Sequence, residues 1–513
     1  MSLQVKPGTQ WTEVYDRARK AAPEAFDADR ILNLSAGEWQ RSGTPGEHVT
    51  PVDGSTIAGP PRIGHEEATA AVKAASVQHR DWAKVDLDER KSRVTAAVDA
   101  MQAERDTLAM LLMWEIGKPW RLACADVDRA LDGVRWYVEQ IERQIVGRAP
   151  LPGPVSNIAS WNYPMSVQVH GELVQLLAGN AVVAKTPSQG GFHTLTLAHA
   201  LMHRAGLPVT LISGVGAELG DVLISSPEIG ALAFVGGRAN GRKAASTLAD
   251  TGKRHMLEQE GLNAWGIWDF SQWDALAGHL KKGFEYAKQR CTAYPRYVVQ
   301  RELFPEFLEA YLPVVRSLRF GHPMAVASPG DPLPDLDFGP VIHATKAVEL
   351  AERYAEAVGG GAIPLYRGNV AEDGLFVDGQ DTSAYVAPAC VLGPPTNWAL
   401  HHAEPFGPLD SVVVVDTESE LLAAMNASNG SLVASVATDD ADFGARVGEQ
   451  LQSFKVGLNK PRSRGDREEV FGGKGASWKG AFVGGDLLVQ AVTQGEGQIY
   501  GNFPTYSLYP ESV

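Results

Sequence analysis

Short apolar runs alternate with longer amphipathic stretches through the middle of the chain. Strands that alternate with helices of this length indicate βαβ units and a parallel sheet with helices on both faces. A second alternating region, from about residue 258 to residue 459, predicts a further α/β domain. In the first region the expected strands are 155–159, 181–184, 209–212 and 231–234, and the expected helices are 165–177, 192–205, 218–224 and 239–249.

The segments before and after the alternating strands and helices predict helices, a loop and a late strand. Residues 66–146 have apolar side chains at helical spacing, and Pro119 is expected to mark a boundary between two helices. A Pro/Gly-rich loop follows at 148–154. The late apolar run 487–492 is expected to be a strand, which adds either to a sheet edge of another subunit or to its own domain.

Composition and charge narrow the class of protein. A chain of 513 residues is expected to form two or three domains, and its net charge of -15 argues against binding to nucleic acid. The sequence has no apolar stretch long enough to cross a bilayer and no secretory signal pattern. Its cysteines, Cys124, Cys291 and Cys390, are too widely spaced for a disulfide framework or a metal-ligand cluster. We therefore expect a cytoplasmic protein with no membrane segment and no bound metal.

Polar residues that follow the first two strands are candidates for chemistry, because ligands bind beyond the carboxyl ends of parallel strands. Asn162, in the segment Ser-Trp-Asn-Tyr-Pro, could donate its amide N–H to a developing oxyanion. Taken alone, an Asn that caps the following helix is the commoner case. Lys185 ends the second strand, where its ammonium is placed to meet phosphate or ribose hydroxyls.

The next two strand-to-helix turns carry glycines. Glycines at such turns allow close approach of a pyrophosphate to the backbone and to the helix N-terminus. Neither turn has the full GxGxxG spacing, but two of them on consecutive units favour a dinucleotide site. The glycines are Gly214, Gly216 and Gly220 in the first turn, and Gly236 and Gly237 in the second.

Two acidic segments are candidates as well. Glu258 and Glu260 follow an expected strand, although a solvated acidic loop is the usual fate of such a pair. Glu404 lies in the rigid turn His-Ala-Glu-Pro-Phe-Gly-Pro, which also contains Phe406.

The best candidate for a nucleophile is Cys291. It lies in an expected loop between a helical stretch, 275–288, and the apolar run 297–299. Most lone cysteines are structural, but Arg290 beside this one and its loop setting favour a reactive thiolate.

Taken in order, these segments resemble the motifs of the aldehyde dehydrogenase superfamily, most clearly from residue 155 to residue 473. The resemblance implies an α/β fold with a Rossmann-like cofactor domain (1–257), a second α/β catalytic domain (258–462), and a return segment with a C-terminal oligomerisation arm (463–513). The matching segments are Ser-Trp-Asn162-Tyr-Pro, Val-Ala-Lys185, Phe-Val-Gly236-Gly237, Leu-Glu258-Gln-Glu-Gly, Gln-Arg-Cys291-Thr-Ala, Glu404-Pro-Phe406-Gly-Pro and Phe471-Gly-Gly473.

The resemblance also implies a mechanism. The Cys291 thiolate would attack an aldehyde, and the oxyanion of the thiohemiacetal would be held by Asn162 and the Cys291 N–H; such a donor is worth about 3–4 kcal/mol. Hydride transfer to nicotinamide would leave a thioester, which Glu258 would hydrolyse by activating water. The implied cofactor-binding residues are Ser160, Trp161, Lys185, Ser188, Gly214, Gly216, Gly220, Gly236, Gly237, Glu404 and Phe406.

Four departures from the family pattern bear on cofactor and assembly. Ser188 stands where NAD⁺-preferring relatives often carry a Glu, which favours NADP⁺ over NAD⁺ here. Gly237 replaces the usual Ser, and Glu260 replaces a Gly and brings a second carboxylate near Glu258. Segment 146–156 is shorter than the family's oligomerisation hairpin, so tetramer assembly by that route is in question, although a homodimer or higher homo-oligomer is expected.

The substrate prediction rests on residues that flank Asn162 and Cys291. Tyr163, Ser166, Val167 and His170 have the spacing of one helix face, and with Arg290 and Thr292 they predict a polar pocket for a polar or anionic aldehyde. A CoA-linked aldehyde fits this pocket too, because the Ala-Ser-Trp-Asn-Tyr-Pro segment resembles the phenylacetate- and benzoate-catabolism branch of the family. His170 as an ordinary helix residue is an equal alternative. The competing functions are a CoA-acylating dehydrogenase and a non-catalytic nucleotide-binding scaffold.

Overall fold

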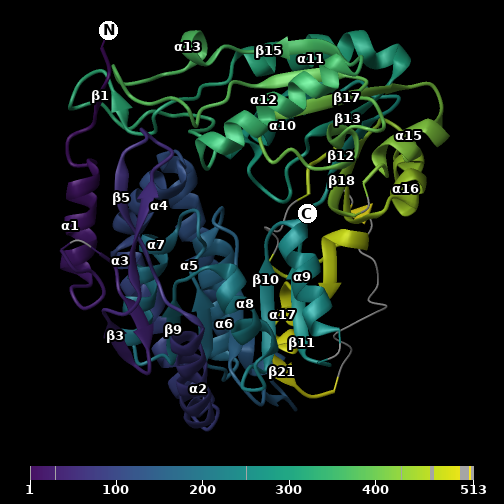
Figure 1. Cartoon of the computed structure of the whole chain (residues 1–513). Helices are drawn as coiled ribbons and strands as arrows, with labels where there is room; N and C mark the ends of the chain where they lie inside the picture. Colours follow the sequence, from purple (N-terminus) through teal and green to yellow (C-terminus); the bar gives the residue numbers. More distant parts are fainter. Residues whose placement is uncertain are drawn as a thin grey trace.

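The computed structural model describes residues 2–28, 30–249, 251–428, 430–462 and 467–496, together with the backbone of 508–509. Two lobes are visible in Figure 1, each built around one sheet. The lobe drawn in purple to teal contains the first sheet, the lobe drawn in green contains the second, and the yellow C-terminal segment returns to the first lobe.

The first sheet has the strand order β20-β11-β10-β7-β8-β9-β2-β3. Its five central strands are parallel, whereas β20 and β2 run antiparallel to their neighbours. The strands are β7 (Val155–Ile158), β8 (Val182–Lys185), β9 (Val209–Ile212), β10 (Ala231–Val235), β11 (Arg254–Glu258), β20 (Trp478–Gly480), β2 (Asn33–Ser35) and β3 (Glu38–Gln40).

The apolar runs form the central strands because they are buried on both faces. Every residue of β8 and β9 is buried, as expected for strands that are covered by helices on both sides. The crossover segments are a π-helix (Pro164–Val169) that continues into α6 (His170–Leu177), then α7 (Phe192–Arg204), α8 (Gly216–Ser225) and α9 (Arg238–Leu248). The predicted alternation in this region is thus confirmed to within one or two residues at most ends.

The N-terminal region is helical, as its spacing predicts. Pro119 is the residue before α5, so the predicted boundary there is confirmed. The helices are α1 (Trp11–Ala21), α2 (His65–Trp82), α3 (Leu87–Ala103), α4 (Arg105–Ile116) and α5 (Trp120–Gln144). The strands are β1 (Gln4–Val5), β4 (Thr44–Val49), β5 (Thr56–Arg62) and β6 (Ala149–Pro150).

The second sheet has the order β15-β16-β17-β13-β12-β18-β19-β22, with antiparallel pairing at β15 alone among the described strands. Its strands are β12 (Ala264–Ile267), β13 (Arg296–Gln300), β15 (Ile363–Arg367), β16 (Ala389–Leu392), β17 (Leu409–Val415), β18 (Ser431–Ala437), β19 (Ser453–Leu458) and β22 (Leu508–Tyr509). Its helices are α10 (Trp273–Gly283), α11 (Phe304–Arg316), α12 (Ala344–Gly359), α13 (Val370–Asp373), α14 (Ala399–His402), α15 (Glu418–Met425) and α16 (Ala441–Gln450).

The chain passes between the two sheets at defined points. It leaves the first sheet after Glu258, enters the second at Ala264, and returns to the first at Trp478. At the other end of the chain, β1 pairs with β14 (Ala325–Val326) of the second lobe. The short segment β6 pairs with β21 (Thr493–Gln494), which ties the loop before β7 to the tail.

Two expectations about secondary structure are wrong. Residues 487–492 do not form a strand, because Gly485–Ala491 is a helix, α17, whose side chains are buried against α5 and α6. When almost every side chain of an apolar run is buried, polar and apolar positions do not alternate, and the pattern does not distinguish a strand from a helix. The helical stretch expected at 275–288 ends at Gly283, and the residues after it take another conformation, described below.

No helix in the described ranges is long and apolar enough to cross a membrane.

Asn180 joins three segments of the first lobe, and its removal is expected to destabilise the fold. Its Oδ1 accepts from the Leu151 N–H (2.9 Å), and its Nδ2 donates to the carbonyls of Val492 (2.7 Å) and Gln175 (3.2 Å). Asn180→Ala leaves buried backbone groups without partners, so we expect the free energy of unfolding to fall by about 2–4 kcal/mol in urea denaturation. The exposed Asn240→Ala on α9 is the control and should change it by less than about 0.5 kcal/mol; equal effects of the two substitutions would contradict the prediction.

Candidate active site

The predicted nucleophile, Cys291, lies in a tightly held loop before β13. The amide of Asn263 donates to the carbonyls of Cys291 and Ala293, both at 2.8 Å. The side-chain oxygen of Asn263, Oδ1, in turn accepts from the backbone N–H groups of Leu432 and Val433. Asn263 is fully buried, so it fixes the backbone from Cys291 to Ala293 to the edge of the second sheet.

The approach to this loop has an unusual backbone. Tyr286, Ala287 and Lys288 have φ values of 59°, 51° and 55°, in the left-handed region that costs a non-glycine residue about 1–2 kcal/mol. Lys288 stabilises this conformation, because its buried ammonium donates to the Asp410 carboxylate (2.6 Å) and to the Tyr294 carbonyl (3.0 Å).

Asn162 comes from the other lobe and meets the same loop. It follows β7 in the turn before the π-helix, and 6% of its surface is exposed. Its Nδ2 donates to the carbonyl of Gln289, two residues before Cys291, at 3.0 Å. Gln289 is itself fixed to Pro340 and Ile342 through its side chain. The predicted oxyanion donor and the predicted nucleophile are therefore brought together.

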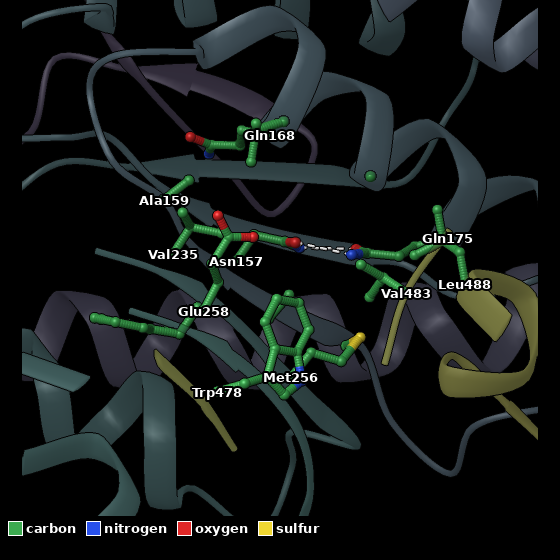
Figure 2. Close-up of a pocket in the computed structure, with 14 residues that line it drawn as sticks. Asn157, Ala159, Gln168, Gln175, Val235, Met256, Glu258, Trp478, Val483 and Leu488 are labelled. Carbon is green, nitrogen blue, oxygen red and sulfur yellow. Dashed lines mark hydrogen bonds between the residues drawn. The ribbon is translucent and has the colours of Figure 1, made fainter. Parts of the chain in front are cut away.

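Glu258 ends β11 and is 2% exposed. Its side chain lines a cavity of about 50 Å³ between the first sheet and the returning C-terminal segment (Figure 2). The residues after it run along the turn at Ser477, which accepts from the Gln259 N–H and donates to the Glu260 carbonyl. Glu258 is thus a buried carboxylate and not part of a solvated acidic loop.

The residues predicted to bind a cofactor lie at the carboxyl ends of the first sheet. Lys185 is buried, its Nζ donates to the Thr186 carbonyl (2.8 Å), and burial lowers its pKa to about 8. Ser188 is exposed and Ser160 half-buried. Trp161 is buried and contacts the ring of Phe406 edge-on, with centroids 6.0 Å apart.

The predicted glycines divide into two groups. A Cβ on Gly214 would lie 2.9 Å from the Ile63 carbonyl, and one on Gly236 would lie 2.9 Å from the Phe234 ring, so close packing requires these two glycines. Gly216, Gly220 and Gly237 face open space or distant atoms. Gly237 caps α9, and the nearest atom to its Cβ position is a carboxylate oxygen of Glu260 at 3.9 Å.

Glu404 is the most strongly perturbed carboxylate of the site. It is 5% exposed, and apart from the nearby Gly261 N–H, whose geometry is poor, neither carboxylate oxygen has a hydrogen-bond partner among the described residues. Burial, and then the negative charge of Glu260, raise its pKa well above the usual 4.5. A buried carboxylate without donors fits the hydroxyl groups of a ribose, which the resemblance predicts at this position.

The residues predicted to line a substrate pocket do not share one face. Tyr163 stacks on the ammonium of Lys118, 3.9 Å from its ring centroid. His170 packs on the Tyr137 ring of α5, and Val167 lines the cavity beside Glu258. The reason is the π-helical turn, which changes the angular spacing that an α-helix would give.

The other predicted pocket residues flank Cys291 or lie beside Tyr163. The backbone N–H of Ser166 donates to Asp126 at 2.9 Å, and both Ser166 and Thr292 are half-buried. Arg290 donates to the Gly283 carbonyl at the end of α10 (2.7 Å), while its buried Nε has no partner among the described residues.

Sequence reasoning missed the residues that hold the site in place. Asn263 lies directly before β12, Lys288 in the loop before β13 and Asp410 at the start of β17, whereas most of the predicted site residues follow strands. Lys118 and Asp126 form a second buried ion pair, at 2.9 Å, beneath Tyr163. A lysine and an aspartate in otherwise apolar segments were a usable signal, since such charges are rarely buried unless paired.

Cys291 also differs from the other two cysteines in its setting. Burial raises the pKa of Cys124 to about 11 and that of Cys390 further still, which disfavours their thiolates. Cys291 is half-buried, at the meeting point of the two lobes. Among the described cysteines it alone combines access with the neighbouring Asn162.

The parallel first sheet, with glycine-bearing turns and a buried lysine at its carboxyl edge, is typical of dinucleotide-binding proteins, and the comparisons with known proteins give the family. The model of the aldehyde dehydrogenase family matches residues 39–494. The chain therefore belongs to the aldehyde dehydrogenase family and is an NAD(P)⁺-dependent aldehyde dehydrogenase, as its sequence motifs predict.

Its relatives share the fold at modest sequence identity. The chain is 26% identical to a mitochondrial succinate-semialdehyde dehydrogenase of Oryza sativa subsp. japonica, over 84% of this chain and 82% of that protein. It superposes on the NADP complex of a glyceraldehyde-3-phosphate dehydrogenase from Bacillus halodurans with a TM-score of 0.81, at 25% identity over 91% and 98% of the two chains. A betaine aldehyde dehydrogenase of Staphylococcus aureus with NAD⁺ gives 0.82, at 22% identity over 94% and 96%.

The raised pKa of Glu404 predicts a specific dependence of stability on pH in the cofactor-free enzyme. The unfolded state loses the Glu404 proton near pH 4.5, whereas the folded state keeps it up to a higher pH. As the pH rises from 4.5 to the pKa of the folded state, Glu404 therefore lowers the free energy of unfolding by up to about 1.4 kcal/mol per pH unit. Glu404→Gln should flatten this fall in urea denaturation between pH 5 and pH 8. The exposed Glu449→Gln serves as control and should keep the wild-type slope; the prediction fails if the Glu404→Gln slope matches it.

Proposed function

We propose that Cys291, Asn162 and Glu258 carry out the oxidation of an aldehyde to a carboxylic acid. The observation that supports this most directly is the hydrogen bond from Asn162 to the carbonyl two residues before Cys291, which joins the two lobes at the thiol. In the reaction the Asn162 amide would turn from this carbonyl to the substrate oxygen. We assign the nucleophile to the half-buried Cys291, because the other two cysteines are buried and burial disfavours their thiolates.

The steps follow from these positions. The Cys291 sulfur forms a bond to the aldehyde carbon, and the oxygen of the resulting thiohemiacetal takes hydrogen bonds from the Asn162 amide and the Cys291 N–H. A nicotinamide bound at this edge would supply the acceptor for the hydride of that carbon, and Cys291 would then carry the acyl group as a thioester. Glu258 then removes a proton from a water molecule whose oxygen bonds to the thioester carbon, the C–S bond breaks, and the thiolate and the acid are released.

This chain's residues would hold the cofactor at the edge of the first sheet. Lys185 and the open N-termini of α8 and α9 supply positive charge and free N–H groups for phosphates. The buried, unpartnered Glu404 would accept from ribose hydroxyls, and Phe406 and Trp161 would pack near the nicotinamide ring.

Substrate, assembly and compartment follow as further parts of the proposal. The unpartnered Nε of Arg290 favours a polar or anionic aldehyde, and the relatives named for succinate semialdehyde and glyceraldehyde 3-phosphate have anionic substrates. A CoA-linked aldehyde is the alternative substrate, whereas a CoA-acylating reaction is disfavoured by the buried Glu258. The negative net charge and the free cysteines fit a cytoplasmic homo-oligomer.

Glu258→Gln should separate the two halves of the reaction. Because Gln cannot take a proton from water, we expect one rapid burst of NAD(P)H per Cys291 and a steady-state rate lower by about 10²–10⁴-fold, measured by stopped-flow absorbance. Cys291→Ser should lose the burst as well. A normal steady-state rate for Glu258→Gln would refute the hydrolytic role of this residue.

The exposed Ser188 predicts a preference for NADP⁺, since no carboxylate stands there to repel a 2′-phosphate. Ser188→Glu should lower kcat/KM for NADP⁺ by about tenfold or more while leaving that for NAD⁺ within about threefold, because like charges in contact cost several kcal/mol. Ser188→Ala controls for loss of the hydroxyl and should keep the preference. A strong NAD⁺ preference in the wild-type enzyme would contradict the prediction.

A further inference from the structure

The cavity behind Glu258 contains an unusual set of polar groups. It lies between the first sheet, the π-helical turn and the returning C-terminal segment, and its polar lining comes from Glu258, Gln168, Asn157 and Gln175 (Figure 2). The remaining lining is largely apolar. Glu258 is the one titratable side chain among the described residues that line it.

Two of the polar side chains satisfy each other. Asn157 Nδ2 donates to Gln175 Oε1 and Gln175 Nε2 donates to Asn157 Oδ1, both at 2.8 Å. In this pair, drawn with dashed lines in Figure 2, each side-chain amide donates to the oxygen of the other. It forms part of the cavity wall and does not need a further ligand.

Gln168 is different. It is 2% exposed, yet neither its Oε1 nor its Nε2 has a hydrogen-bond partner among the described residues. A buried amide left in this state costs about 1–3 kcal/mol for each unsatisfied group, and buried water is the usual partner. The cavity of about 50 Å³ exceeds the roughly 10–15 Å³ that one water molecule requires.

The Glu258 carboxylate points into the same cavity, toward the side where the Gln168 amide lies (Figure 2). We propose that this cavity is a water chamber, in which Gln168 holds a water molecule that hydrogen-bonds to Glu258. The water accepts from Gln168 Nε2 and donates to a carboxylate oxygen of Glu258. Gln168 is then a positioning residue that keeps the carboxylate charged and oriented as a base.

This inference rests on the role of Glu258 in the proposed function. It adds that hydrolysis of the thioester depends on an amide that does not touch the substrate. Two other ionisable groups of the site lie outside the chamber lining. Cys291 belongs to the nucleophile loop, and Glu260 faces Gly237 and Glu404. Loss of the chamber water would therefore act on Glu258 alone, by removing a hydrogen-bond donor that stabilises its charged form.

The test measures hydrolysis of an acyl group on Cys291 directly, without cofactor. p-Nitrophenyl acetate transfers its acetyl group to a reactive thiol, and rapid quenching followed by mass spectrometry gives the rates at which the adduct forms and decays. We compare wild type with Gln168→Leu, which keeps the volume and removes the amide, and with Gln168→Asn, which keeps an amide and leaves room for a second water. Met256→Leu alters the apolar lining and serves as the matched control.

For Gln168→Leu we expect adduct formation at the wild-type rate, decay slowed about tenfold, and the pH midpoint of decay moved upward. Gln168→Asn and Met256→Leu should decay within about threefold of wild type. Unchanged decay and midpoint in Gln168→Leu would overturn the proposal, and so would a parallel loss in formation and decay, which indicates a merely structural role. If wild type forms no adduct at Cys291, or if Glu258→Gln decays normally, the proposed function itself fails.

Discussion

The nucleophile loop depends on one buried ion pair, formed by Lys288 and Asp410. Three consecutive residues with left-handed backbone precede Cys291, and nothing in their side-chain chemistry favours that conformation. Lys288 contributes contacts to Asp410, Tyr294 and Tyr297, and Asp410 also accepts from Tyr311, so both charges have several partners. Breaking such a pair typically costs 3–5 kcal/mol, which is of the same order as the strain of three left-handed residues at about 1–2 kcal/mol each. The ion pair can therefore offset much of the strain of a backbone that the local sequence would not adopt by itself.

The two sheets contribute residues to the site from opposite ends of their strands. From the first sheet come residues at the carboxyl ends of strands: Asn162 after β7, Lys185 in β8 and Glu258 in β11. From the second sheet come residues before the strands begin: Cys291 before β13 and Glu404 before β17. The site lies where the carboxyl edge of one sheet faces the amino edge of the other. Neither edge by itself carries all the proposed site residues. The hydrogen bond from the Asn162 amide to the Gln289 carbonyl joins the two edges.

This arrangement explains how far the sequence could predict the molecule. The alternation in the first lobe was predicted because apolar runs such as 209–212 need burial on both faces, and that need is local to the sequence. The left-handed run before Cys291 could not be predicted, because its cause lies more than a hundred residues away, at Asp410. The π-helical turn likewise separated Val167 from His170, since an extra residue in one turn alters every later direction. Motif resemblance pointed to the proposed catalytic residues, but not to Asn263, which holds the loop that contains Cys291.

Lys185 and Glu404 have in common that burial disfavours their charged forms. Burial lowers the pKa of Lys185 to about 8 and raises that of Glu404, so each charged form is less stable here than in water. Such groups lower the stability of the empty enzyme, and a ligand that supplies their missing hydrogen bonds recovers that free energy on binding. By the same linkage, a ligand that donates hydrogen bonds to the Glu404 carboxylate would stabilise the fold and draw this group toward its ionised state.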